Sequence, residues 1–243
     1  MIKTRTKVSV IVPAYNEESF LARTLESLKN QTYPNYELIV VDNNSTDSTN
    51  AIAKRYTDLV FVEKRQGYIN AVRRGVAESD GELLTFCDAD TLYPSTWLEK
   101  AARSMARHPS APALYGTCST HDAGALMNRI NGFIHTQFLR ASRLLGLENT
   151  SGFNLVMRRA AFEAVGGYDP RFMKMSPDIE LGRRLRRVGP ILFRTSITVQ
   201  VSFRRFQRGG VLKTQWMYLK SWYQMARGRA PSLSYEQYNA RSR

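Results

Sequence analysis

The chain has 243 residues, 43% of them hydrophobic, which is enough for one sizeable domain with its own core. Its longest apolar runs have the length of a strand and fall far short of a membrane span. No signal peptide is expected, because no basic start followed by an apolar stretch opens the chain. The two cysteines lack metal-ligand spacing, so we expect buried free thiols in the reducing cytoplasm.

The net charge of +14 lies almost entirely in the second half of the chain. Residues 1–126 contain 14 Lys/Arg and 15 Asp/Glu, whereas residues 127–243 contain 21 and 6. This asymmetry indicates an acidic partner, which could be nucleic acid, anionic lipid or a phosphorylated substrate. A basic surface that only keeps the protein soluble explains the charge equally well.

Apolar, β-branched runs alternate with helical patterns along the first half. The predicted strands cover residues 8–15, 36–42, 60–62 and 83–87. Helical spacing of apolar residues follows each of them, near residues 20–28, from about 47, after Gly67 and over 95–107. Strands alternating with helices predict an α/β fold, with a mostly parallel, Rossmann-like sheet flanked by helices.

Polar residues follow three of these strands, at the edge where open α/β sheets bind ligands. The first strand runs into "PAYNE" (13–17), the second ends at Asp42, and the fourth delivers Asp88 and Asp90. In extended backbone Asp88 and Asp90 project to the same side, where they repel unless a cation or a shared proton lies between them. Neither GxGxxG nor GxxxxGK[ST] is present, which argues against dinucleotide and P-loop sites.

Five segments resemble glycosyltransferase family 2, the inverting nucleotide-sugar transferases of GT-A fold. They are "VSVIVPAYNEE" (8–18), "ELIVVDNNSTD" (37–47), "CDAD" (87–90), "GGYDP" (166–170) and "SPDIELGRRL" (176–185). The resemblance extends to about Arg208. It implies a GT-A domain over residues 1–228, divided into a nucleotide-sugar half (1–120) and an acceptor half (121–228), with a polar tail at 229–243.

The resemblance also implies a donor site and a divalent cation. Asp42 would accept a hydrogen bond from the base, and Asp90, beside Asp88, would bind the Mn²⁺ or Mg²⁺ that bridges the diphosphate. Hard cations prefer oxygen ligands, and the cation would let both carboxylates stay ionised. The alternative is a polar turn in which Asp88 caps the next helix. The implied donor-binding residues are Pro13, Ala14, Tyr15, Glu17, Asp42, Asp88, Ala89, Arg204 and Arg205.

Asp178 matches the position of the family's catalytic base. It would take the proton of the acceptor hydroxyl as that oxygen attacks the anomeric carbon from the face opposite the leaving group. Arg204 or Arg205 would neutralise the departing diphosphate. Glu180, one helical step on, is the rival base, and Asp178 could instead be a carboxylate that only stabilises a helix start. The implied acceptor-side residues are Gly152, Phe153 and Glu180.

Three departures from the family pattern bear on the subgroup. Pro177 stands where relatives usually have Glu, and Leu92 replaces a Gln found in dolichyl-phosphate mannose synthases. The Q-x-x-R-W element of processive polysaccharide synthases is absent, and "SFRRFQRGG" (202–210) takes its place.

The segment "GVLKTQWMYLKSWYQMARGR" (210–229) predicts a helix with Trp216 and Tyr223 on one stripe. Aromatic residues beside Lys and Arg suit a helix at the membrane interface, which would make the protein peripheral on the cytoplasmic membrane face. Packing of the same stripe on the protein's own domain is slightly favoured.

The expected function is inverting transfer of a sugar from a nucleoside-diphosphate donor to an acceptor hydroxyl. A UDP-sugar is favoured over a GDP-sugar, and the expected acceptor is a glycan or polyprenyl-linked precursor of the cell surface. One alternative is a nucleotidyltransferase on a similar sheet, although the acidic "PAYNEESF" differs from the basic, Gly-rich loop that such an enzyme needs. The other is a basic nucleic-acid- or lipid-binding module, in which grouped acids would repel phosphate, so no nucleic-acid partner is expected.

Overall fold

The computed structural model describes residues 6–144, 146, 148–172, 177–202, 204, 216, 220 and 223–224. Arg205 and the polar tail at 229–243 lie outside the described residues. So does most of the helix predicted at 210–229.

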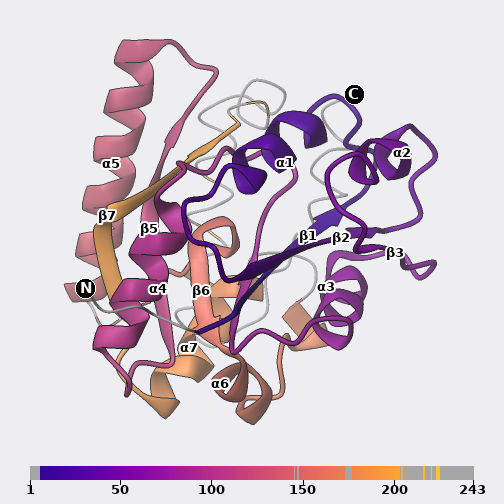
Figure 1. Cartoon of the computed structure of the whole chain (residues 1–243). Helices are drawn as coiled ribbons and strands as arrows, with labels where there is room; N and C mark the ends of the chain where they lie inside the picture. The colour runs from indigo at the N-terminus through magenta and orange to yellow at the C-terminus, as the bar shows by residue number, and fades with distance from the viewer. Residues whose placement is uncertain are drawn as a thin grey trace.

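Within the described residues, seven strands form one sheet in the order β3-β2-β1-β4-β6-β5-β7 (Figure 1). β3, β2, β1 and β4 are parallel, β6 is antiparallel to both β4 and β5, and β7 is parallel to β5. The predicted α/β class is therefore confirmed. The strands are β1 (Val8–Ala14), β2 (Tyr36–Asp42), β3 (Val60–Val62), β4 (Leu83–Phe86), β5 (Ala113–Thr120), β6 (Leu155–Arg158) and β7 (Leu192–Val201).

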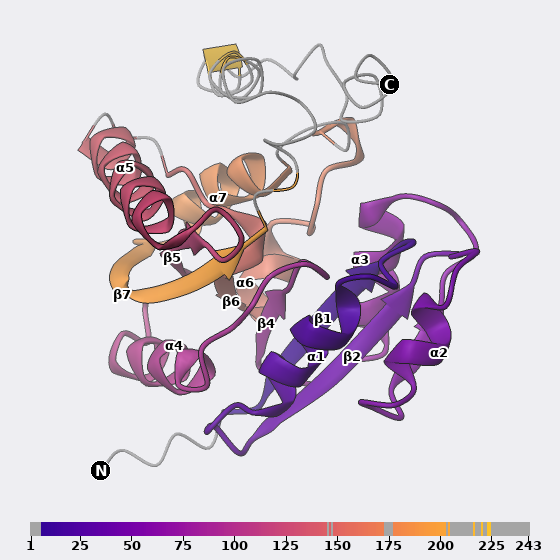
Figure 2. The ribbon, with the colours of Figure 1, turned by 90° about the horizontal axis from the view of Figure 1, so that it is seen from above.

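Helices cover both faces of the sheet (Figure 2). α1, α2 and α4 pack on one face, and α3, α5, α6 and α7 lie on the other. Their bounds are α1 (Leu21–Lys29), α2 (Thr49–Ala53), α3 (Tyr68–Ala77), α4 (Trp97–Arg107), α5 (Ala125–Leu144), α6 (Arg159–Ala164) and α7 (Pro177–Val188). Short 3₁₀ turns occupy Gly152–Asn154 and Pro170–Phe172.

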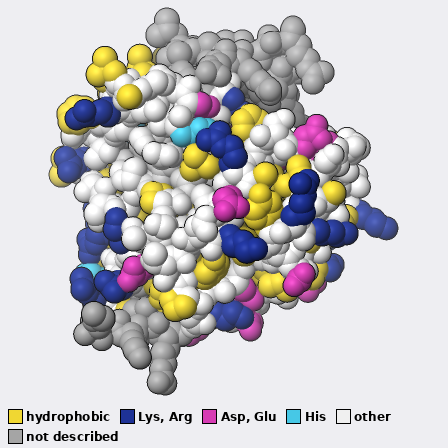
Figure 3. All heavy atoms as spheres, turned by 45° about the horizontal axis from the view of Figure 1, so that its top comes forward, with side chains coloured by type: hydrophobic (Ala, Val, Ile, Leu, Met, Phe, Trp, Pro, Cys, Tyr) yellow, Lys and Arg dark blue, Asp and Glu magenta, His cyan; other side chains and the backbone are white. Residues whose placement is uncertain are grey.

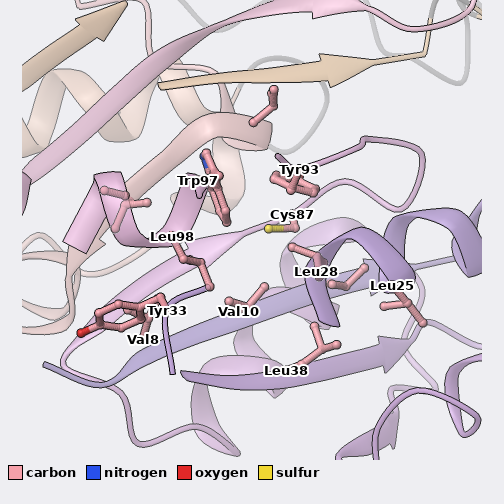
Figure 4. Packing of buried hydrophobic residues seen from close by; sticks show 14 of the residues in the cluster. Val8, Val10, Leu25, Leu28, Tyr33, Leu38, Cys87, Tyr93, Trp97 and Leu98 are labelled. Carbon is pink, nitrogen blue, oxygen red and sulfur yellow. The ribbon is translucent and has the colours of Figure 1, made fainter. Parts of the chain in front are cut away.

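The core has two parts because the central strands are apolar on both faces. Val10 of β1 and Leu38 of β2 point to the α1/α4 side, where they meet Leu25, Leu28 and Trp97 (Figure 4). Their neighbours Ile11 and Ile39 point to the α3 side. Continuous hydrophobic runs are what a strand buried on both faces requires.

Asn154 fixes the 3₁₀ turn that precedes β6. Its side chain is fully buried and donates to the carbonyls of Thr117 (2.8 Å) and Ile197 (3.0 Å), while it accepts from the Trp97 indole (2.9 Å). Four elements are thereby joined at the turn that also carries Gly152 and Phe153.

Cys87 and Cys118 are buried free thiols, as predicted. Burial raises the pKa of each to about 12, so neither is a thiolate at neutral pH. In the described part of the chain, no helix combines the length and apolar character needed to cross a bilayer.

Candidate active site

The loops after β1 and β2 form one hydrogen-bonded unit at the carboxyl edge of the sheet. Asn43 N donates to the Ala14 carbonyl (2.8 Å), and Asn16 N donates to Ser45 Oγ (3.0 Å). Asn16 and Asn44 have φ angles of 52° and 63°, a left-handed conformation that Asn tolerates better than most residues. These bonds hold the "PAYNE" segment beside the end of β2.

Asp42 is a buried carboxylate in a fixed orientation. Only 4% of the residue is exposed, and its two oxygens accept from Ser45 N and Asn50 Nδ2, each at 3.0 Å. Each carboxylate oxygen has two lone pairs, so Asp42 can still accept a bond from a ligand. Tyr15 is 49% exposed, which leaves its ring available for contact with a ligand.

Arg204 connects the two predicted parts of the donor site. Its Nη1 and Nη2 donate to Glu17 at 2.9 and 2.7 Å, and its Nε lies 2.8 Å from Asp90 Oδ2. The guanidinium also lies over the Phe20 ring, 4.5 Å from its centroid. One planar cation thus joins the loop after β1 to the Asp88–Asp90 turn, although 187 residues separate Arg204 from Glu17.

The Asp88–Asp90 turn is held by contacts that the sequence did not predict. Leu92 and Gln200 exchange backbone hydrogen bonds of 2.8 and 2.9 Å, which place the end of β7 beside the turn. His121 Nε2 lies 3.3 Å from the Asp90 carbonyl oxygen. The chain that follows β7 therefore carries Arg204 directly into the site.

The carboxylates suit a hard divalent cation only in part. Asp88 and Asp90 supply oxygen donors, and the Arg204 contact shows that Asp90 favours a positive neighbour. Among the described residues, no three His, Cys, Asp or Glu side chains are grouped as a metal site. A cation here would need phosphate or water oxygens to complete its ligand shell.

Asp178 lies in the first turn of α7 and is partly buried. The Tyr168 hydroxyl and the Gly152 backbone N–H both donate to its carboxylate. Thr150 Oγ1 donates to its backbone carbonyl (2.5 Å). Burial raises the pKa of Asp178, and these donors offset part of that increase. Such a carboxylate binds a proton more readily than an ordinary Asp.

Tyr68 links the surroundings of the two predicted acid groups. Its ring packs edge-on against Tyr168, with centroids 5.9 Å apart. Burial, followed by the charges of Asp178 and Asp88, raises the pKa of Tyr68 well above its usual value. The charges of Asp178 and Asp88 therefore both disfavour ionisation of the Tyr68 hydroxyl.

Glu180, the rival base, already has a strong partner. Arg184 donates to both of its oxygens (2.8 and 2.5 Å), and Arg184 is itself anchored to the Val165 carbonyl. Phe153 is half-buried, and its ring lies 6.4 Å from the ring of His135 on α5. Gly152 thus contacts Asp178 directly, whereas Glu180 is occupied within its own helix.

Sequence reasoning missed Tyr68, Tyr168 and His121 as members of the site. Tyr168 lies within the "GGYDP" motif, so its position was marked although its role was not. Nothing in the sequence around Tyr68 or His121 distinguishes them from packing residues.

Acidic side chains and an arginine gather at the carboxyl edge of a mostly parallel sheet, which is where α/β enzymes bind their ligands. The chain belongs to glycosyl transferase family 2, whose family model matches residues 9–166. The matched region contains the loop after β1, Asp42, Asp88, Asp90 and Gly152, while Asp178 and Arg204 follow it.

Curated relatives match most of this chain. Glycosyltransferase AglE of Haloferax volcanii is 28% identical over 200 residues, which cover 78% of this chain and 64% of AglE. O-antigen biosynthesis protein RfbC of Myxococcus xanthus is 30% identical over 213 residues, which cover 77% of this chain and 16% of RfbC. The chain thus spans less than two thirds of the length of either relative.

Solved structures share the fold. The mannosyltransferase PcManGT from Pyrobaculum calidifontis, in complex with GDP-Man and Mn²⁺, superposes with a TM-score of 0.72 at 22% identity, over 98% of this chain and 69% of its own. S. aureus TarS 1–349 in complex with UDP-GlcNAc gives a TM-score of 0.62 at 21% identity, over 81% of this chain and 58% of its own. The predicted GT-A fold is confirmed by these likenesses.

Proposed function

We propose that this protein is an inverting glycosyltransferase that moves a sugar from a nucleoside-diphosphate donor to an acceptor hydroxyl. The observation that carries the proposal is the environment of Asp178. A carboxylate that is partly buried, oriented by Tyr168 and Gly152, and raised in pKa is suited to accept a proton. Family membership supports the same activity.

The donor would bind across the loops after β1, β2 and β4. Asp42 would accept from the base, and the exposed Tyr15 ring would contact it. A UDP-sugar is the preferred donor because a pyrimidine imide N–H matches the Asp42 acceptor. Guanine offers similar donors, and the structural neighbours contain UDP-GlcNAc in one case and GDP-Man in the other.

Arg204 would pair with the diphosphate. In the structure its fork contacts carboxylates of Glu17 and Asp90, and phosphate oxygens fit the same geometry. Donor binding would then exchange carboxylate partners for phosphate partners. Arg205, which lies outside the described residues, remains a second candidate for this role.

Asp90, with Asp88 beside it, would hold Mn²⁺ or Mg²⁺ together with phosphate oxygens. The cation would stabilise the negative charge that develops on the leaving diphosphate. Its role is supported by the oxygen donors and by the Mn²⁺ in the PcManGT complex.

Asp178 would remove the acceptor proton as the hydroxyl attacks the anomeric carbon. One base and one displacement invert the anomeric centre and need no nucleophile from the protein. The acceptor would lie near Gly152 and Phe153. A glycan or polyprenyl-linked precursor of the cell surface is the proposed acceptor, and the similarity to the O-antigen biosynthesis protein RfbC supports that class.

The test is turnover of a panel of UDP- and GDP-sugars in the presence of Mn²⁺, measured as the release of nucleoside diphosphate. We expect Asp178→Asn to lose at least ~100-fold in kcat while donor binding persists. Glu180→Gln is the matched control and should retain most activity. Near-normal turnover of Asp178→Asn, with loss in Glu180→Gln, would transfer the base role to Glu180. Consumption of a nucleoside triphosphate with pyrophosphate release would instead identify a nucleotidyltransferase.

A further inference from the structure

α5 exposes an apolar stripe that the described part of the chain leaves uncovered. The exposed side chains recur at helical spacing along its 20 residues, and the yellow and dark blue spheres at the upper left of Figure 3 mark this region. The most exposed apolar residues of the helix are Leu126 (73%), Met127 (47%), Ile130 (41%), Phe133 (65%), Ile134 (56%) and Leu144 (90%).

The face of α5 that contacts the sheet combines polar side chains with Leu139, which is buried in the core. Thr136 Oγ1 lies 2.7 Å from Thr117 Oγ1, and Asn128 Oδ1 accepts from Thr120 Oγ1 at 2.5 Å. His135 is partly buried against β5, and desolvation lowers its pKa to about 4, so it is neutral there. A helix that only completes a core turns its apolar face inward. On α5, by contrast, most of the apolar side chains are exposed.

Basic residues border the stripe. Arg129, Arg140 and Arg143 lie on α5, and residues 125–144 contain no Asp or Glu. Within the part of the chain that the structure describes, Arg143 is 3.7 Å from Glu148, whereas no acidic partner contacts Arg129 or Arg140. The helix therefore combines exposed apolar side chains with uncompensated positive charge.

We propose that this outer face of α5 binds the surface of an anionic membrane, with the apolar stripe among the headgroups and the arginines on lipid phosphates. A 20-residue helix is about 30 Å long, and α5 is not apolar enough to span a bilayer. A helix that lies in the plane of the interface buries its apolar stripe at the boundary between headgroups and acyl chains and keeps its arginines at the lipid phosphates. A second copy of the chain fits less well, because a two-fold contact through this face would bring like charges together.

The proposed membrane surface lies next to the acceptor side of the site. His135 of α5 packs near Phe153, and Phe153 follows Gly152, which contacts Asp178. Membrane binding itself does not depend on sugar transfer. If the proposed function holds, a lipid-linked acceptor would reach Asp178 from this surface, and that step alone rests on the proposed function.

Sedimentation with vesicles tests the surface directly. We expect the whole chain to bind phosphatidylglycerol/phosphatidylcholine vesicles and to bind pure phosphatidylcholine vesicles much more weakly. The double variant Ile130→Glu/Phe133→Glu should bind at least tenfold more weakly, since it places two carboxylates in the stripe. Arg129→Gln/Arg140→Gln should lose about fivefold per charge removed.

Val188→Glu is the matched control, because Val188 is 51% exposed on α7 and lies outside the stripe. Unchanged thermal unfolding of every variant would show that the folded state is intact. Equal binding by the wild type and both double variants would overturn the proposal, as would absence of vesicle binding. Loss of binding only on deletion after Gly210 would assign the membrane contact to that segment instead. A dimer that dissociates in Ile130→Glu/Phe133→Glu, without vesicle binding, would make the stripe a self-association surface.

Discussion

Gly152→Ala tests the placement of the proposed base, because no side chain fits between this glycine and Asp178. A Cβ at position 152 would lie 2.6 Å from Asp178 Oδ1, 2.7 Å from Cγ and 2.8 Å from Oδ2. Ordinary contacts begin at 3.4 Å. The carboxylate would therefore have to move by about 0.8 Å, and displacements near 1 Å are enough to cost about 100-fold in rate.

We expect Gly152→Ala to reduce kcat about 100-fold while KM for the donor changes by less than about threefold, since the donor loops are not touched. Steady-state release of nucleoside diphosphate measures both constants. Gly132→Ala is the control, because its Cβ would lie 3.3 Å from Ser119 Cβ and 3.4 Å from the Cys118 carbonyl oxygen, away from Asp178. If Gly152→Ala turns over at close to the wild-type rate and unfolds at the same temperature, Asp178 is not the group that takes the proton.

Three further predictions follow from the same contacts. Tyr168→Phe removes a donor that lowers the pKa of Asp178, so the acidic limb of the pH–rate profile should move to higher pH. The kcat should fall about tenfold, as expected for the loss of one hydrogen bond to a charged group. An unchanged pH–rate profile would exclude this contact from catalysis. Arg204→Lys replaces the fork that contacts Glu17 and Asp90, so affinity for the nucleoside diphosphate, measured by calorimetry, should fall about tenfold, while affinity for the free nucleoside should not change. Burial raises the pKa of Asp178 in the folded state, so its stabilising contribution is present at low pH and is lost as the pH rises. Asp178→Asn should therefore melt above the wild type at neutral pH and show no advantage in acid. A lower melting temperature at neutral pH would contradict this.

The central sheet was predictable because its strands are buried on both faces. Continuous β-branched runs such as residues 8–12 are typical of parallel strands that are buried on both faces. The carboxyl-edge residues followed from the same strands, because parallel strands end at one edge. This logic correctly placed Asp42 beside the loop after β1.

The features that the sequence did not predict depend on contacts between segments that are far apart in the chain. β6 lies antiparallel between β4 and β5, and the local sequence of residues 155–158 does not predict that pairing. β6 begins only at Leu155, because Gly152–Asn154 form a 3₁₀ turn held by the Asn154 side chain. The contact of Arg204 with Glu17 likewise requires that β7 pair with Leu92.

α5 shows why periodicity alone could not orient a helix. Its pattern contains an apolar stripe, and the usual rule directs such a stripe to the core. In the structure, hydrogen bonds between β5 and the Thr136 and Asn128 side chains hold these polar groups inward. The arginines and the exposed apolar residues consequently share the outer side, which only the coordinates reveal.

Calorimetric titration of UDP and GDP, with Mn²⁺ and with excess chelator, tests the central claim most directly. We predict that one diphosphate binds at least about tenfold more tightly in Mn²⁺ than in chelator, and that Asp90→Asn abolishes this difference. Equal affinity in Mn²⁺ and in chelator, unchanged in Asp90→Asn, would contradict a nucleotide-sugar site built on the carboxyl ends of β1, β2 and β4.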